Sequence, residues 1–152
     1  MSQDLNLISN REVYLFKNNL NLSQGEILEL AVKAIVHPTY GWLTTVLILY
    51  GCRIIETFSL KPSSDGTATV IDFDINPSKN LRRKVLANPI DFVEKLNICD
   101  QISQPVFYEN YEDYNFDELN NIIPNWNSWF KNIKSNLELD DLRGYWLKRA
   151  IK

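Results

Sequence analysis

The sequence is poor in the residues on which most catalytic sites depend. It contains one histidine, His37, and two cysteines, Cys52 and Cys99, among 152 residues. Any Ser-His-Asp, Cys-His or histidine-rich zinc site would have to use that single imidazole. The cysteines form no C-x-x-C pair. We therefore expect His37 to cap the end of a helix before Pro38, and the cysteines to stay reduced thiols in the cytoplasm.

Phosphate-binding loops and membrane segments are also missing. Neither G-x-G-x-x-G nor G-x-x-x-x-G-K-[ST] occurs, which disfavours the common kinds of nucleotide chemistry. The first ten residues lack the basic and apolar parts of a secretory signal. The most apolar window, residues 42–55, is shorter than the roughly 20 residues that a membrane-spanning helix needs. We expect no cofactor, no bound metal and no membrane association.

The composition is that of an ordinary globular protein. Hydrophobic residues make up 45% and charged residues 23%, and the chain has the usual length of one domain. The sequence therefore predicts a single domain over residues 1–152, with residues 1–10 as a candidate flexible segment.

In the first half of the chain the pattern predicts one helix among strands. Residues 11–17 alternate and indicate a strand. Ser23 and Glu26 have the spacing of a capping box, which predicts a helix from Ser23 to about His37. Apolar runs at 42–50, 53–60 and 67–75, separated by turn residues at Gly51 and at 61–66, predict three consecutive antiparallel strands. A helix through 42–50 is the alternative.

In the second half the period of the apolar residues becomes helical. Helices are predicted at 79–87, after Pro89, from Pro124 and from about Asp140. A stripe of Trp126, Trp129 and Phe130 should face the core. The fold class is thus α+β, with a four-stranded, mostly antiparallel sheet covered by an N-terminal helix and several C-terminal helices.

Two aspartates in the run TATVIDFDIN raise the question of a metal. In a strand, Asp72 and Asp74 would lie on one face roughly 7 Å apart, and Glu56 on the preceding strand could approach them. Mg²⁺ accepts such ligands, so a metal-dependent phosphoesterase is one hypothesis. An alternating strand with a solvated polar face has the same pattern, and we prefer that interpretation.

Charge points to a different surface. Residues 100–118 hold six acidic groups and no basic ones, interleaved with aromatic side chains. Tyrosine is enriched at protein interfaces, and carboxylates can steer a basic partner into place. The predicted partner-binding residues are Tyr108, Glu109, Tyr111, Glu112, Asp113, Tyr114 and Asp117. They indicate a cytoplasmic interaction module, an adaptor or an immunity-type inhibitor that binds a basic protein. Alternatively, this segment folds onto the chain's own basic residues, such as Arg82, Arg83 and Lys84.

A third hypothesis is RNA binding through the basic helix predicted at 79–87. The order of helix, three strands and helix resembles in outline the double-stranded-RNA-binding domain, and this resemblance implies contacts between that helix and phosphates. The aspartates at 72 and 74 and an overall pI near 5.2 oppose such contacts, so nucleic acid is disfavoured as a partner.

Overall fold

The structure is a computed structural model that describes residues 23–38, 40–100 and 108–151. The α-helices are α3 (Gln24–Ala34), α4 (Gly41–Tyr50), α5 (Asp91–Lys95), α6 (Phe116–Ile133) and α7 (Asp141–Ile151). The strands are β1 (Lys61–Pro62), β2 (Thr67–Ile71) and β3 (Arg82–Leu86). The 3-10 helices are η1 (Ile54–Ser59), η2 (Pro77–Lys79), η3 (Ile98–Asp100) and η4 (Tyr111–Asp113).

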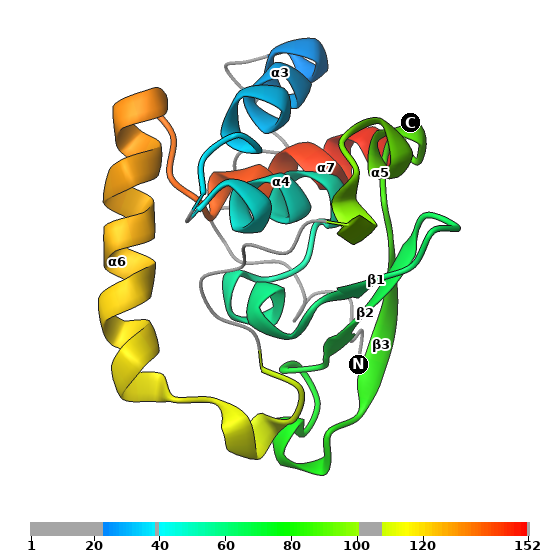
Figure 1. Cartoon of the computed structure of the whole chain (residues 1–152), viewed down its shortest axis with the longest axis vertical. Coiled ribbons are helices and arrows are strands. Elements are labelled where there is room, and N and C mark those ends of the chain that lie inside the picture. The colour runs from blue at the N-terminus through cyan, green and yellow to red at the C-terminus, as the bar shows by residue number, and fades with distance from the viewer. Residues whose placement is uncertain (1–22, 39, 101–107, 152) are drawn as a thin grey trace.

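Helix α4 forms the centre of the molecule. Helices α3 and α7 pack against it, and so do η1 and strand β3. In Figure 1, α3 lies above α4, the sheet lies at the right, and the long helix α6 stands along the left side. The buried apolar residues form one continuous cluster around α4.

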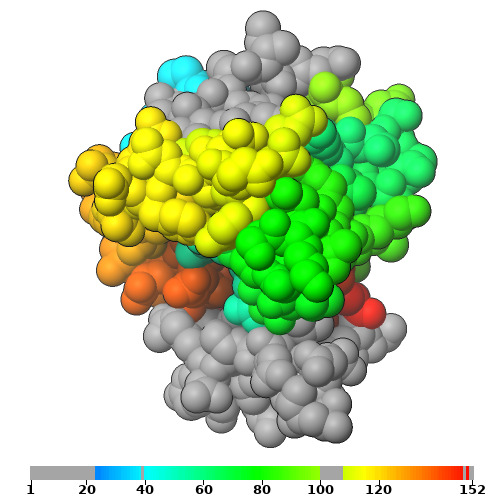
Figure 2. Space-filling view, turned by 90° about the horizontal axis from the view of Figure 1, so that it is seen from below, coloured from blue at the N-terminus to red at the C-terminus, as the bar shows by residue number. Residues whose placement is uncertain are grey.

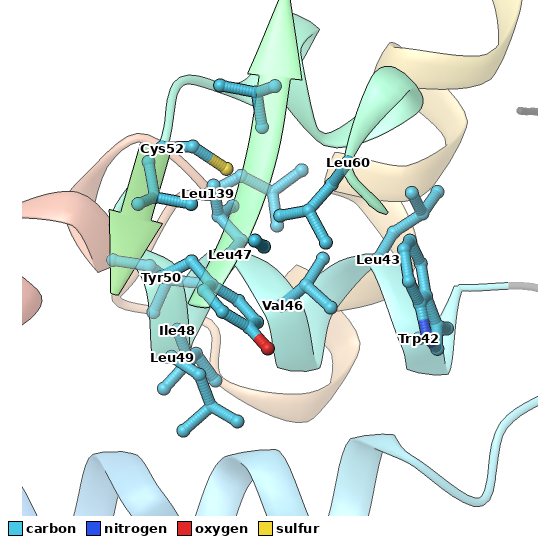
Figure 3. Packing of buried hydrophobic residues seen from close by; sticks show 14 of the residues in the cluster. Trp42, Leu43, Val46, Leu47, Ile48, Leu49, Tyr50, Cys52, Leu60 and Leu139 are labelled. Atoms are coloured by element: carbon cyan, nitrogen blue, oxygen red, sulfur yellow. The ribbon is translucent and has the colours of Figure 1, made fainter. Parts of the chain in front are cut away.

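Every residue of α4 is buried, and this explains why its sequence predicts a strand as readily as a helix. An apolar run without polar positions carries no period, and a helix that is apolar all round belongs in a core. Figure 3 shows Val46 and Leu47 pointing toward Leu60 and the sheet, and Ile48 and Leu49 pointing to the opposite side, toward α3. Our prediction of a strand at 42–50 is therefore wrong, and the alternative helix is confirmed.

Gly51 ends α4 and does not open a hairpin. Its backbone is left-handed, with φ of 64°, which is the usual conformation after a helix C-terminus. The ring of Trp146 on α7 lies where a side chain at this position would begin, 2.4 Å from an ideal Cβ. Both the conformation and the close approach require glycine here.

Among the described residues the sheet has three antiparallel strands, in the order β1, β2, β3, and not four. The predicted α+β class is confirmed, but the strand predicted at 53–60 is the 3-10 helix η1. The helix predicted at 79–87 is wrong as well, because that segment contains η2 and strand β3, which pairs with β2. Pairing with a neighbouring strand has overridden the local helical preference. The predicted strand at 11–17 and segment 1–10 lie outside the described residues.

The capping box of the first helix is confirmed. Glu26 N–H donates to Ser23 Oγ (3.1 Å), and Ser23 N–H donates to the Glu26 carboxylate (2.9 Å). These hydrogen bonds hold the pKa of Glu26 below its ordinary value. Two amide groups that the first turn leaves without helical partners are thereby satisfied.

We expect Ser23→Ala to remove about 1 kcal/mol from the free energy of unfolding, because the hydroxyl acceptor is lost. The melting temperature should fall by roughly 2–4 °C. Ser64→Ala, in the exposed turn between β1 and β2, is the matched control and should melt like the wild type. Equal melting of Ser23→Ala and the wild type would show that the cap contributes nothing.

One of the two C-terminal helices is longer than predicted. Helix α7 begins at Asp141, as expected, whereas α6 begins eight residues before Pro124. The side chain of Asn115 caps α6 by accepting from Glu118 N–H (3.0 Å). Pro124 lies inside the helix on an exposed turn, where water can satisfy the carbonyl that lacks an intrahelical donor. Of the predicted core stripe, Trp126 and Phe130 are fully buried and Trp129 is half-buried.

Candidate functional site

The three carboxylates that the sequence suggested as metal ligands do come together. One oxygen from each of Glu56, Asp72 and Asp74 lies within 4.8 Å of the others. Glu56 is fully buried in η1. The two aspartates follow the end of β2, where Asp74 N–H donates to Asp72 Oδ1 (2.9 Å) in a tight turn. They do not face water from a strand as we predicted, because β2 ends at Ile71 and Asp72 is buried.

Two arginines that the sequence did not indicate complete this group. Arg83 Nη2 lies 2.5 Å from Glu56 Oε1, and Arg83 Nε lies 4.0 Å from Asp72 Oδ1. Arg53 Nε lies 2.6 Å from Asp74 Oδ1. We call these five residues the carboxylate–arginine cluster. The cluster joins η1, the turn after β2 and the core-facing side of β3, so it links the sheet to the 3-10 helix η1.

The electrostatics of the cluster are dominated by Glu56. Its oxygens accept from the backbone N–H groups of Arg53 (2.9 Å) and Phe73 (3.3 Å) in addition to the Arg83 guanidinium. Burial nevertheless raises the pKa of Glu56, and Arg83 opposes that shift. Three carboxylates against two guanidinium groups leave one excess negative charge, which agrees with a carboxyl that resists ionisation.

A divalent cation would have to displace these arginines. Asp74 Oδ2 is buried without a hydrogen-bond partner among the described residues, so the cluster retains one open acceptor. The two guanidinium groups already balance two of the three carboxylate charges, however. We therefore expect calorimetric titration with Mg²⁺, Mn²⁺ and Ca²⁺ to show no site tighter than about 100 µM. Tighter binding that Asp72→Asn abolishes would instead support the phosphoesterase hypothesis.

The remaining candidate nucleophile and base are placed for structural roles. Cys52 is fully buried beside a cavity of about 100 Å³, and burial raises the pKa of its thiol to about 12. A thiol with that pKa is protonated at neutral pH and a poor nucleophile. His37 lies beyond the end of α3, and its Nδ1 accepts from Tyr40 N–H (3.0 Å) at the start of α4. His37 therefore links the end of α3 to the start of α4, and its backbone N–H donates to Ala34 O (2.9 Å).

Residues 108–118, the described part of the acidic segment, lie directly against the turn that carries Asp72 and Asp74. Phe73, between the two aspartates, packs its ring on Tyr114 (5.1 Å between centroids) and on Tyr111 (5.9 Å). Figure 2 shows residues of the segment (yellow) crossing the face of the molecule beside the turn after β2 (green). The structure thus brings together two features that the sequence presented separately.

The predicted partner-binding residues fall into two groups. Tyr108 and Tyr114 are buried, and their hydroxyls donate to Glu118 Oε1 (2.7 Å) and to Ile55 O (2.9 Å). Glu109 forms an ion pair with Lys61, which lowers the pKa of Glu109. These three residues hold the segment on the body of the protein.

The second group is exposed to solvent. Glu112, Asp113 and Asp117 are exposed, and none of them forms an ion pair with a described residue. Glu112 accepts a hydrogen bond from a neutral side chain, because Asn80 Nδ2 donates to its Oε2 (3.2 Å). Phe116 is 42% exposed beside these acids, and Tyr111 is half-buried. We call Tyr111, Glu112, Asp113, Phe116 and Asp117 the acidic patch.

The alternative, in which the acidic segment folds onto the chain's own basic residues, is therefore correct for the part of the segment at Glu109. Arg82 Nη2 donates to the carbonyl of Glu109 (2.9 Å), and Lys61 pairs with the Glu109 side chain. Arg83 instead belongs to the carboxylate–arginine cluster, where it pairs with Glu56. The end that contains the acidic patch receives no such charge from the described residues.

No protein-family model, no curated protein and no solved structure matches this chain. Among the residues that the structure describes, no helix combines the length and the apolar character needed to cross a membrane. Function is therefore inferred from geometry and chemistry alone.

Proposed function

We propose that this chain is a protein-interaction module and that the acidic patch binds a basic partner. The observation that carries the proposal is an exposed phenylalanine in a segment whose exposed carboxylates have no counter-charges among the described residues. An aromatic anchor surrounded by polar groups is a common arrangement at protein interfaces. An adaptor and an immunity-type inhibitor of a basic protein both use a surface of this kind.

The patch is held rigidly, which favours binding. Tyr111 N–H donates to Asn80 Oδ1 on one side, and the rings of Tyr114 and Phe116 stack on the other, 5.9 Å apart. The Asn110 and Asp113 pair closes the turn at η4, with Asn110 N–H donating to Asp113 Oδ2 (3.1 Å). A surface that is already ordered loses little conformational entropy when a partner binds.

The cytoplasm remains our proposed location. Cys99 is exposed, and neither Cys52 nor Cys99 forms a disulfide bond. Exposed thiols persist in a reducing compartment and are oxidised outside it.

Photo-crosslinking through position 116 tests whether a partner contacts the patch. Phe116 is replaced by p-benzoylphenylalanine and the protein is irradiated in lysate of its source cells. Val36, which is 81% exposed at the end of α3, carries the same photoreactive group in the control. We expect an adduct with a basic protein from position 116 and not from position 36. Identical adducts from the two positions would contradict the proposal.

Neutralising the patch should then slow association with the crosslinked partner. In Glu112→Gln/Asp113→Asn/Asp117→Asn each amide oxygen can still accept the native hydrogen bonds, so only charge is lost. We expect the association rate at low salt to fall about tenfold and to depend less on ionic strength, because steering is electrostatic. Surface plasmon resonance at several salt concentrations measures both effects.

The matched control neutralises three exposed acids elsewhere, Glu29, Asp91 and Glu94, on α3 and α5. This variant should bind like the wild type, because its net charge changes equally but its patch is intact. The patch variant should melt within a few degrees of the wild type, since exposed charges contribute little to stability. A patch variant that is destabilised but binds at the wild-type rate would assign these acids a structural role only.

A further inference from the structure

Within the part of the chain that the structure describes, strand β3 has one edge without a partner strand. It pairs with β2 on one side only, and no described strand lies on the other. Figure 1 shows β3 at the outer margin of the sheet. Lys84 and Leu86 are exposed on this strand, Leu86 at 46%. A free strand edge is a template for pairing with another extended segment.

The hydrogen-bond register identifies which backbone groups are open. Asp72 N–H donates to Leu81 O (2.9 Å), and Ala87 N–H donates to Gly66 O (2.8 Å). In an antiparallel ladder the bonds to one neighbour recur at every second residue. Odd-numbered residues from 81 to 87 therefore bond toward β2. Arg82, Lys84 and Leu86 direct their N–H and C=O groups to the free edge.

The same register places the side chains of these three residues on one face of the sheet. Arg82 is opposite Ile71, Lys84 is opposite Thr69, and Leu86 is opposite Thr67. The Arg82 guanidinium, however, donates to the carbonyls of Ser59 (2.9 Å), Thr69 (3.2 Å) and Glu109 (2.9 Å), on the side of β2 and β1. The edge thus offers one exposed cation, Lys84, followed by one exposed apolar side chain, Leu86.

Charge decides between a second copy of the chain and a different partner. Two antiparallel copies of β3 would place arginine and lysine side chains close to each other, and like charges on adjacent strands are destabilising. Lys84 forms no ion pair with any described residue, although Asp65, which is held by Thr67, lies within its electrostatic influence. Lysines on edge strands commonly prevent such self-pairing.

We propose that the free edge of β3 binds an extended acidic peptide segment as an added antiparallel strand. Residues opposite Arg82, Lys84 and Leu86 share their face of the sheet. The bound segment therefore has an apolar residue opposite Leu86 and, two positions later, an acidic residue opposite Lys84. Main-chain hydrogen bonds supply affinity, and these alternate side chains supply selectivity.

A peptide of sequence TVTETET tests the proposal with the full chain. Its valine and its first glutamate take the positions opposite Leu86 and Lys84, whereas TVETTET has the same composition with that glutamate on the opposite face. We expect saturable binding of TVTETET at low salt, measured by fluorescence anisotropy, and binding of TVETTET that is weaker by about tenfold. Absence of saturable binding, or equal binding of the two peptides, would overturn the proposal.

Two variants of Lys84 locate the site. Lys84→Pro removes only the N–H that faces the free edge, because proline is tolerated on the open side of an edge strand. Lys84→Glu keeps that N–H and reverses the charge, so it decides the matter even if the proline variant fails to fold. Each should weaken TVTETET binding by about tenfold, while Lys131→Glu on exposed α6 should not.

Amide hydrogen exchange supplies an independent readout. The peptide should slow exchange at the amides of Arg82, Lys84 and Leu86 and leave those of Arg83 and Val85, which already bond to β2, unchanged. Protection elsewhere in the chain without protection at these three amides would refute the proposed register. Sedimentation without peptide tests the other possible occupant of the edge, a second copy of the chain. Self-association that Lys84→Pro abolishes would assign the edge to that second copy.

Discussion

Arg83→Met should lower the free energy of unfolding by about 3 kcal/mol at neutral pH. The guanidinium pairs with Glu56, whose side chain is fully buried. Methionine retains the apolar part of the side chain, so the loss is one of charge and not of packing. For a chain of this length the melting temperature should fall by roughly 6–12 °C, which calorimetry can measure.

A second substitution tests whether the unpaired charge is the cause. In Arg83→Met/Glu56→Gln the carboxylate is neutral, so the double variant should be more stable than Arg83→Met alone. Lys84→Met, at the next position on β3, changes an exposed cation and should leave the melting temperature almost unchanged. A double variant no more stable than the single one would mean that Arg83 contributes through packing.

Acidification should restore part of the stability of Arg83→Met. Burial raises the pKa of Glu56, and the opposing effect of Arg83 is absent in the variant, so the pKa rises further. The folded state then binds a proton more readily than the unfolded state. Stability from this group is therefore present at low pH and lost as the pH rises through the folded pKa. The deficit of Arg83→Met relative to the wild type should shrink between about pH 7 and 5. A constant deficit would contradict this account.

This cluster shows what the sequence could and could not predict about the site. The proximity of Glu56, Asp72 and Asp74 followed from a strand pairing that does not exist, because 53–60 is helical. The arginines were not predicted, since their roles depend on where β3 pairs with β2. One local signal was available: Arg53 and Glu56 stand three residues apart, and Glu56 accepts from the Arg53 N–H as in a capping box.

Local signals predicted the fold correctly wherever they were specific. The reciprocal hydrogen bonds of Ser23 and Glu26 need no tertiary contact, and the first helix was placed accurately. The run at 42–50 was ambiguous because its surroundings decide between helix and strand, and they are apolar on every side. At 79–87 basic residues that favour a helix in isolation form a strand, because β2 offers hydrogen bonds to their backbone.

The acidic segment illustrates how exposure divides residues that look alike in sequence. Tyr108, Tyr111 and Tyr114 recur at helical spacing among acids, yet Tyr108 and Tyr114 are buried and Tyr111 is only half-buried. Burial raises the pKa of the Tyr108 hydroxyl to about 12, aided by its hydrogen bond to Glu118. These two tyrosines therefore act as anchors that present the acidic patch.

Trp126→Ala should be the most damaging single substitution, with a loss of about 4 kcal/mol in the free energy of unfolding. Trp126 is fully buried, and its ring meets Phe58 edge-on at 6.0 Å between centroids. Its Nε1–H donates to Thr44 Oγ1 (2.8 Å) on α4. Alanine would leave a cavity between α6 and the core and a buried hydroxyl without its donor. The melting temperature should fall by roughly 8–16 °C.

Trp129→Ala is the matched control on the same helix. Trp129 is half-buried against the rings of His37 and Tyr40, so its loss should cost about 1–2 kcal/mol. Because α6 begins beside the acidic patch, Trp126→Ala should also speed amide exchange through α6 and weaken binding to a crosslinked partner. The patch variant, whose three acids are neutralised, should weaken that binding without changing amide hydrogen exchange in α6. If Trp129→Ala proved as destabilising as Trp126→Ala, α6 would be held by its outer aromatic contacts and not by the tryptophan that enters the core.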